Sequence, residues 1–112
     1  MENINYKMGW LVVFFDLPTT TDEDKKNYVN FRKSLLNDGY LMIQYSVYAR
    51  ACVSHDRILT HTRRVKSFLP PKGTVRCLFV TNIQWNKTFI FYGPDVIPTE
   101  PPEKIPEQLL LW

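Results

Sequence analysis

The first hydrophobic segment of the chain, at 9–16, predicts a strand that is buried on both faces. It is dominated by aromatic and β-branched residues, which favour a strand over a helix. Alternate side chains of a strand point to opposite sides, and here both sets are apolar, so both faces need a cover. Pro18 lacks an N–H and ends the strand, which leaves Asp16 at the rim of a rigid element.

The rest of the pattern predicts two helices and three more extended segments. Thr21 is a helix N-cap with Asp24 as a variant of the capping box, and this helix ends at Asp38-Gly39. Residues 40–52 are extended, as one bent strand or a very tight pair, because no Gly or Asn-Gly marks a turn. Ser54 caps a second helix at 55–68, whose buried stripe would be Ile58, Leu59, Thr62, Val65 and Phe68. A strand at 74–80, a turn or single helical turn at 81–86 and a short final strand at 88–92 follow.

This order of elements predicts the α+β class. Two helices on one face of an antiparallel sheet form a ferredoxin-like βαββαβ plan, here with an extra C-terminal strand. The other face of the sheet then lacks a cover. We therefore expect a homodimer in which two sheets pack face to face through an isologous interface.

Length and composition fit one small domain with a tail. Residues 1–93 form the expected domain, and 94–112 form a proline-rich C-terminal tail. The tail ends in apolar residues that are expected to fold back or to dock on a partner: Leu109, Leu110, Leu111 and Trp112. No signal peptide is visible, and no apolar run approaches the ~20 residues of a membrane span, so we expect a cytoplasmic protein that does not associate with membranes.

The net charge and the two cysteines exclude few kinds of functional site. The net charge of +3 is compatible with nucleic-acid binding but does not establish it. Cys52 and Cys77 are not spaced as a CxxC pair, so buried thiols are expected rather than a disulfide or a zinc site.

Three motifs resemble those of the CRISPR-associated Cas-Two family, in the same order and within one small domain. The first is the apolar strand that ends in Asp with a nearby Pro, Val12-Val-Phe-Phe-Asp-Leu-Pro18. The second is Ile43-Gln-Tyr-Ser-Val-Tyr48, and the third is Thr81-Asn-Ile-Gln-Trp85, followed by Gly93. The resemblance covers about residues 9–93, and members of this kind accompany type II systems.

The resemblance implies a ferredoxin-like homodimer whose final strand packs on the partner's sheet. It implies a divalent-metal-dependent endonuclease acting on RNA, or on double-stranded DNA in some members. It also implies a role in spacer acquisition, in which the dimer binds duplex nucleic acid and bridges the partner integrase, Cas-One. A non-catalytic structural scaffold of that integration complex is the alternative, and a toxin-like or regulatory dimer on the same fold is a more distant one.

Asp16 is the candidate catalytic residue and metal ligand. Mg²⁺ (or Mn²⁺) is satisfied by one or two carboxylates plus waters, and a two-fold axis near the strand end would bring two copies of Asp16 to one ion. Such a metal acidifies its bound water and neutralises charge on the scissile phosphate. On the residues alone, the favoured explanation is a carboxylate that starts a turn before Pro18 and bonds nearby backbone N–H groups, and it is the resemblance that makes Asp16 the expected metal ligand.

For the other polar residues, the sequence supports a functional role less strongly than for Asp16. Tyr45 and Ser46 lie near the metal or phosphate by resemblance, although ordinary strand packing also explains them. His55 and His61 are expected on a helix surface. A basic set around the second helix is expected to contact nucleic-acid phosphates, or simply to be a solvated face: Arg50, Arg57, Arg63, Arg64, Lys66, Lys72 and Arg76. An RNA-recognition motif is disfavoured because 40–48 lacks its glycines.

Overall fold

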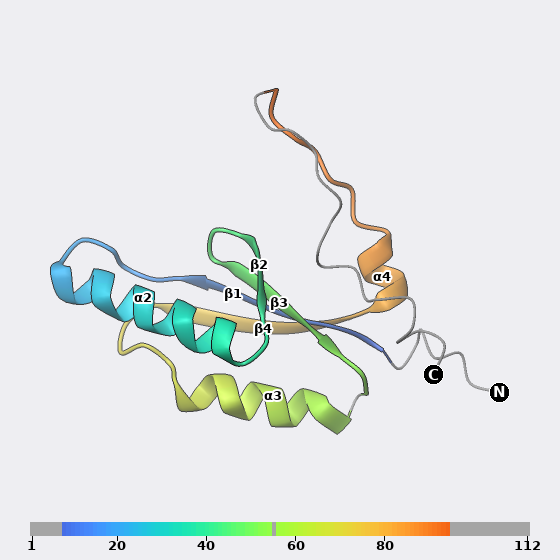
Figure 1. Ribbon diagram of the computed structural model, residues 1–112, viewed down its shortest axis with the longest axis horizontal. Coiled ribbons are helices and arrows are strands. Elements are labelled where there is room, and N and C mark those ends of the chain that lie inside the picture. Colours follow the sequence, from blue (N-terminus) through green and yellow to red (C-terminus); the bar gives the residue numbers. More distant parts are fainter. Residues whose placement is uncertain (1–7, 55, 95–112) are drawn as a thin grey trace.

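The computed structural model describes residues 8–54 and 56–94 as a four-stranded antiparallel sheet with helices. The elements are β1 (Gly9–Asp16), α2 (Asp22–Asn37), β2 (Leu41–Gln44), β3 (Val47–Cys52), α3 (Asp56–Ser67), β4 (Thr74–Thr81) and α4 (Asn82–Asn86). The strand order is β2-β3-β1-β4, with β1 in the interior of the sheet (Figure 1). This is the ferredoxin-like βαββαβ arrangement, so the predicted fold class is confirmed.

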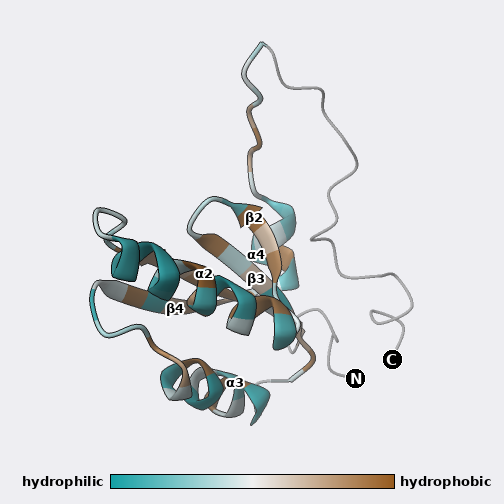
Figure 2. Ribbon diagram, turned by 60° about the vertical axis from the view of Figure 1, so that its left-hand side comes forward, coloured by the Kyte–Doolittle hydropathy of each residue, from teal (hydrophilic) through white to brown (hydrophobic). Residues whose placement is uncertain are grey.

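One face of the sheet packs against α2 and α3. The alternate β1 residues Leu11, Val13 and Phe15 are at most 8 % exposed and form a core with Phe31 of α2 and Val65 of α3. The Phe15 ring meets the Phe31 ring edge-on, with 5.0 Å between centroids. The two helices keep their polar sides outward, as the teal colouring of Figure 2 shows. This layer is the main hydrophobic core of the domain.

The opposite face of the sheet is apolar, and among residues 8–54 and 56–94 it is covered at one end only. Trp10, Val12 and Phe14 of β1 point to this side, which we call the open face. Trp85 of α4 stacks on Trp10 with 5.3 Å between ring centroids. Further along, Leu78 of β4 is 52 % exposed. The prediction that both faces of β1 are apolar is thus confirmed, and most of the open face is without a cover within the described residues.

The helix ends follow their sequence signals. The Thr21 hydroxyl accepts from the Asp24 N–H at 3.0 Å and the Asp24 carboxylate accepts from the Thr21 N–H at 3.3 Å, which completes the predicted capping box. The backbone bond from Thr21 lowers the pKa of Asp24. Gly39 follows α2 with φ +91°, the left-handed conformation expected after the helix end.

Residues 40–52 are a tight pair of strands rather than one bent strand. Gln44 pairs with Val47, so only Tyr45 and Ser46 form the turn. Ser46 has φ +65°, the one positive φ among the described residues that are not glycine. The turn had no sequence signal because its left-handed position is occupied by Ser instead of the usual Gly or Asn.

The short final strand predicted at 88–92 is wrong for the single chain. Residues 88–92 leave α4 and run away from the sheet without strand hydrogen bonds (Figures 1 and 2). Phe89 and Phe91 are 85 % and 90 % exposed. A strand needs a neighbouring edge, and this segment does not return to either edge of its own sheet. The leader at 1–7 and the tail beyond residue 94 lie outside the described residues, as do Leu109, Leu110, Leu111 and Trp112.

The buried stripe of α3 also differs from the prediction. Leu59 is 64 % exposed, whereas His61 is only 8 % exposed. The helix meets the core along Ile58, His61, Val65 and Phe68, so it is rotated relative to the predicted stripe. His61 was expected on the surface, and this expectation is wrong because its helical position lies on the same side as Val65.

No helix in the described part of the chain has the length and apolarity needed to cross a membrane.

Candidate functional site

Asp16 lies where β1 leaves the sheet, and its side chain is exposed on the open face. It pairs with Thr74 of β4 in the antiparallel ladder. Within the described residues, its carboxylate has no ion pair or hydrogen bond. A carboxylate that started the turn before Pro18 would bond nearby N–H groups, so the structure gives that alternative no support.

Two left-handed turns hold the backbone on either side of Asp16. On one side, the Phe15 N–H donates to the Ser46 carbonyl at 3.0 Å, which ties β1 to the β2–β3 turn. On the other side, Gly73 has φ +95° and packs so closely that a Cβ there would lie 2.5 Å from the Asp16 carbonyl oxygen. The end of β1 is therefore fixed between the turns before β3 and before β4.

Tyr45 and Ser46 are turn residues, so their explanation as ordinary strand packing is wrong. Tyr45 is 86 % exposed beside the end of β1. Ser46 reaches β1 through its carbonyl oxygen, which orients the strand end. Ser46 is thus bonded to the residue next to Asp16, and a role of Tyr45 and Ser46 near a metal or a phosphate stays a prediction.

A complete metal centre is not formed within the described part of this chain. It contains no group of three or more His, Cys, Asp or Glu side chains that could hold an ion. Asp16 alone fits the requirement of Mg²⁺ in one respect: it is an exposed, unpaired carboxylate with room for waters.

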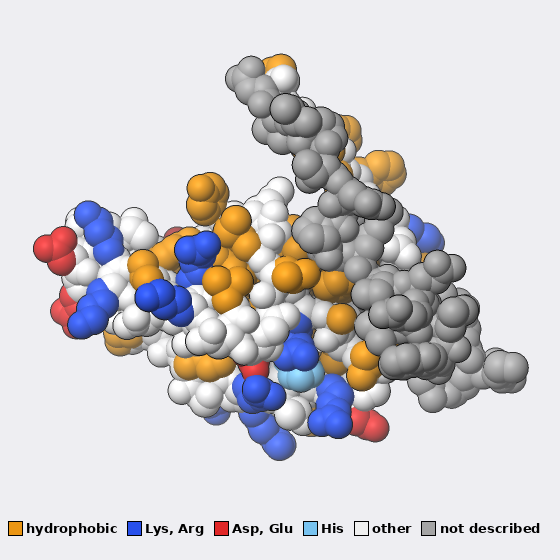
Figure 3. All heavy atoms as spheres, viewed as in Figure 1, with side chains coloured by type: hydrophobic (Ala, Val, Ile, Leu, Met, Phe, Trp, Pro, Cys, Tyr) orange, Lys and Arg blue, Asp and Glu red, His pale blue; other side chains and the backbone are white. Residues whose placement is uncertain are grey.

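The predicted basic set is divided between the two faces of the sheet. Arg76 pairs with Phe14 and so lies on the open face, whereas α3 carries Arg57, Arg63, Arg64 and Lys66 on the helix side. Arg and Lys side chains gather over α3 in the space-filling view (Figure 3). The sequence placed all seven residues around the second helix, and this grouping is wrong for Arg76 because strand register decides its face.

Three members of the basic set are held by intramolecular contacts. Arg64 forms an ion pair with Asp38, whose side chain is 6 % exposed, and Arg50 donates to the backbone carbonyl of Asp38. These contacts fasten the end of α2 to α3 and β3. Desolvation lowers the pKa of the adjacent His61, and the nearby charge of Arg50 lowers it further. We infer a structural role for this cluster. His55 lies outside the described residues.

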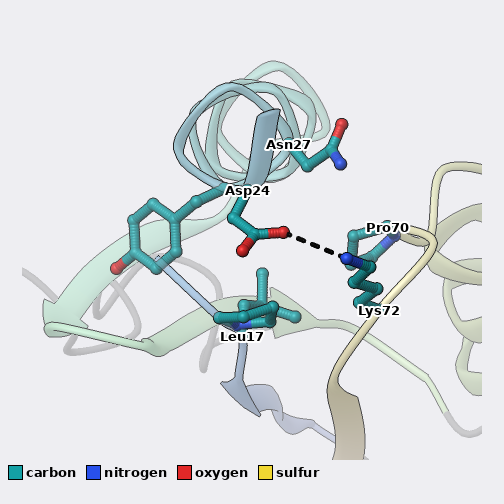
Figure 4. Close-up of a pocket in the computed structure, with 7 residues that line it drawn as sticks. Leu17, Asp24, Asn27, Pro70 and Lys72 are labelled. Atoms are coloured by element: carbon teal, nitrogen blue, oxygen red, sulfur yellow. Dashed lines mark ion pairs between the residues drawn. The ribbon is translucent and has the colours of Figure 1, made fainter. Parts of the chain in front are cut away.

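Lys72, the third, lines a small pocket beyond the end of β1. Its ammonium lies 3.7 Å from the Asp24 carboxylate, and Leu17, Asn27 and Pro70 line the same pocket (Figure 4). The pocket encloses about 170 Å³ even when open solvent is included. Typical ligand sites hold about 300–1,000 Å³, so this pocket is too small for a nucleotide.

The third sequence motif has a local structural explanation. The Thr81 hydroxyl accepts from the Gln84 N–H at 3.1 Å, and the Gln84 side chain accepts from the Thr81 N–H at 2.8 Å. This capping box starts α4 and directs Trp85 onto Trp10. The residues that sequence analysis missed are Gly73 and Thr74, and the signal was the glycine directly before β4.

Comparisons with known proteins agree with this geometry. Residues 8–88 match the family model described as CRISPR associated protein Cas2. Three relatives carry the name CRISPR-associated endoribonuclease Cas2. The protein from Flavobacterium psychrophilum is 38 % identical over 99 residues, which cover 88 % of this chain and 86 % of the relative. That from Ligilactobacillus salivarius is 44 % identical over 86 residues, with 77 % and 85 % covered. That from Parvibaculum lavamentivorans is 40 % identical over 103 residues, with 92 % and 99 % covered.

Proposed function

The chain belongs to the CRISPR-associated Cas2 family, and from this premise we propose that it is a metal-dependent endonuclease of a CRISPR system that acts as a homodimer. The names of the relatives support nuclease activity on RNA. The observation that carries the proposal is Asp16: an exposed carboxylate without a partner in the described chain, held at the end of a buried strand by turns on both sides.

The proposed homodimer is supported by two apolar surfaces that one copy leaves exposed. The open face carries Leu78 and Phe14, and the segment at 88–92 carries Phe89 and Phe91 in solvent. A second copy would cover the apolar middle of the open face around Leu78 with its own sheet and leave Asp16, at the end of β1, on the rim of the interface. Its 88–92 segment would find a strand edge there. This arrangement explains why a segment with strand composition forms no strand in one chain.

Asp16 of each copy would hold the Mg²⁺ or Mn²⁺ ion of the site. When bound, such an ion makes a bound water more acidic and offsets the charge that develops on the phosphoryl oxygens. The chain's own part is to hold the carboxylate in place. Because the end of β1 is tied at Phe15 and packed against Gly73, Asp16 needs little reorganisation to act as a ligand.

The test is the Asp16→Asn variant, which keeps the size of the side chain and removes its charge. We expect loss of Mg²⁺-dependent cleavage of single-stranded RNA and of duplex DNA, with an unchanged far-UV circular dichroism spectrum. Asp56→Asn, at an exposed position in the first turn of α3, is the control and keeps activity. Cleavage by the Asp16 variant at the wild-type rate would remove Asp16 from the mechanism.

A non-catalytic scaffold of the integration complex is the second candidate. It is favoured by the single carboxylate at the site and by the absence of a three-ligand group among the described residues. In this role the homodimer binds duplex nucleic acid and bridges the Cas-One integrase. The same Asp16→Asn variant separates the two functions, because integration that persists without cleavage shows that cleavage does not drive acquisition.

Contacts with the partner are proposed for the apolar end of the chain. Leu109, Leu110, Leu111 and Trp112 form a short apolar segment after a proline-rich stretch, a pattern typical of docking peptides. Removal of 94–112 is expected to abolish co-elution with the integrase. Co-elution of the truncated chain at the wild-type ratio would place the contact elsewhere.

A further inference from the structure

The register of β1 against β4 brings Arg76 next to Asp16. Asp16 pairs with Thr74, and Phe14 pairs with Arg76, so all four side chains point to the open face. Arg76 is thus the diagonal cross-strand neighbour of Asp16. Such neighbours lie about 7–8 Å apart, which long side chains can span.

Arg76 and Asp16 are both exposed and do not form an ion pair with each other. Neither has a charged partner elsewhere in the described residues. On the open face of the four strands, Arg76 is the one Lys or Arg of the described chain. Arg64 and Lys72 have partners instead, at Asp38 and Asp24. Arg76 therefore presents an unused guanidinium beside an unused carboxylate.

We propose that Arg76, with the Thr74 hydroxyl beside it, forms the phosphate subsite of the Asp16 site and binds the nucleic-acid phosphodiester group. This inference rests on the proposed function of Asp16. A carboxylate by itself repels a phosphate, and a guanidinium one register step away offsets that repulsion. The planar guanidinium donates two parallel hydrogen bonds to phosphate oxygens, which orients the group as well as attracting it.

The subsite binds the backbone without selecting bases. Phosphate contacts position a nucleic acid and carry no sequence information. The subsite lies on the opposite face of the sheet from the basic residues of α3, Arg57, Arg63, Arg64 and Lys66.

The experiment measures binding of a fluorescein-labelled single-stranded RNA in EDTA, by anisotropy, across a fourfold range of salt. The full-length proteins are wild type, Arg76→Gln, Arg76→Lys and Lys33→Gln. Lys33 is exposed on α2 and serves as the charge-matched control. The quantity compared is the affinity at the lowest salt divided by the affinity at the highest salt. Removing one cation that binds a phosphate lowers this ratio by about 3.5-fold for duplex DNA and by roughly 2.6-fold for single strands.

We expect Arg76→Gln to lower this ratio by the roughly 2.6-fold of single strands. Lys33→Gln should leave the ratio unchanged. Arg76→Lys should keep the wild-type ratio but bind the RNA more weakly. A slope of Arg76→Gln equal to that of wild type overturns the subsite, even where cleavage still requires Asp16. An equal loss of slope in Lys33→Gln also overturns it, because the effect would then be one of net charge. A selective loss in Arg76→Gln supports the subsite even where Asp16→Asn still cleaves, so the two proposals fail separately.

Discussion

Gly73→Ala tests whether the close packing beside Asp16 fixes the end of β1. Gly73 and Gly39 have nearly equal φ angles, +95° and +91°. Their surroundings differ: a Cβ at Gly73 would lie 2.5 Å from the Asp16 carbonyl oxygen and 2.6 Å from Leu17 Cδ2. At Gly39, the nearest atom would be a guanidinium nitrogen of Arg50 at 3.4 Å, an ordinary contact with the end of a side chain.

Both substitutions lose stability because they place Ala in the left-handed backbone region, but only Gly73→Ala also adds a steric clash with backbone. Alanine in the left-handed region costs about 1–2 kcal/mol at either position. At Gly73, the added methyl must also displace backbone, and overpacking of this kind costs roughly a further 1–3 kcal/mol. Since the free energy of unfolding of small domains is only about 5–15 kcal/mol, Gly73→Ala is expected to remove a large part of it.

The assay is urea unfolding at one fixed protein concentration, followed by an RNA cleavage assay of the folded variants. We expect Gly73→Ala to be the less stable variant by about 1–3 kcal/mol. It should also lose cleavage, because its backbone shift displaces Asp16, while Gly39→Ala keeps it. Equal losses of stability would refute the packing argument, and full cleavage by Gly73→Ala would show that the position of Asp16 does not depend on this contact.

Three further predictions address other parts of the domain. Thr81→Ala removes the N-cap of α4 and should cost about 1 kcal/mol in thermal or urea unfolding, whereas an unchanged free energy of unfolding would show that the capping box with Gln84 is dispensable. Because burial and Arg50 lower the pKa of His61 below 6.5, the folded state resists its protonation, so stability is complete above pH 6.5 and falls as the pH drops through 6.5 toward the lowered pKa. His61→Gln should flatten that part of a melting-temperature profile, and a parallel profile would contradict it. Phe89→Ser combined with Phe91→Ser should convert the proposed dimer to monomer in sedimentation velocity, and a dimer that survives dilution would exclude the segment from the interface.

The local elements of this protein are determined by its sequence. The period-two pattern of β1, the capping residue Thr21 and the helix stop at Gly39 depend on neighbours within a few positions, so they could be predicted without tertiary information. The family motifs depend on local order too, and they led to the family that the comparisons confirmed. Asp16 was placed at the end of β1 by the same short-range logic.

Tertiary structure decided which side chains share a face. Arg76 was grouped with the helix until its pairing with Phe14 placed it beside Asp16, because strand register depends on residues some 60 positions away. His61 is buried because of the rotation of α3 on the sheet. Gly73 fixes the end of β1 because it packs against the backbone of Asp16. The segment at 88–92 has the composition of a strand and forms none in one chain, since a strand exists only when an edge is available to pair with it.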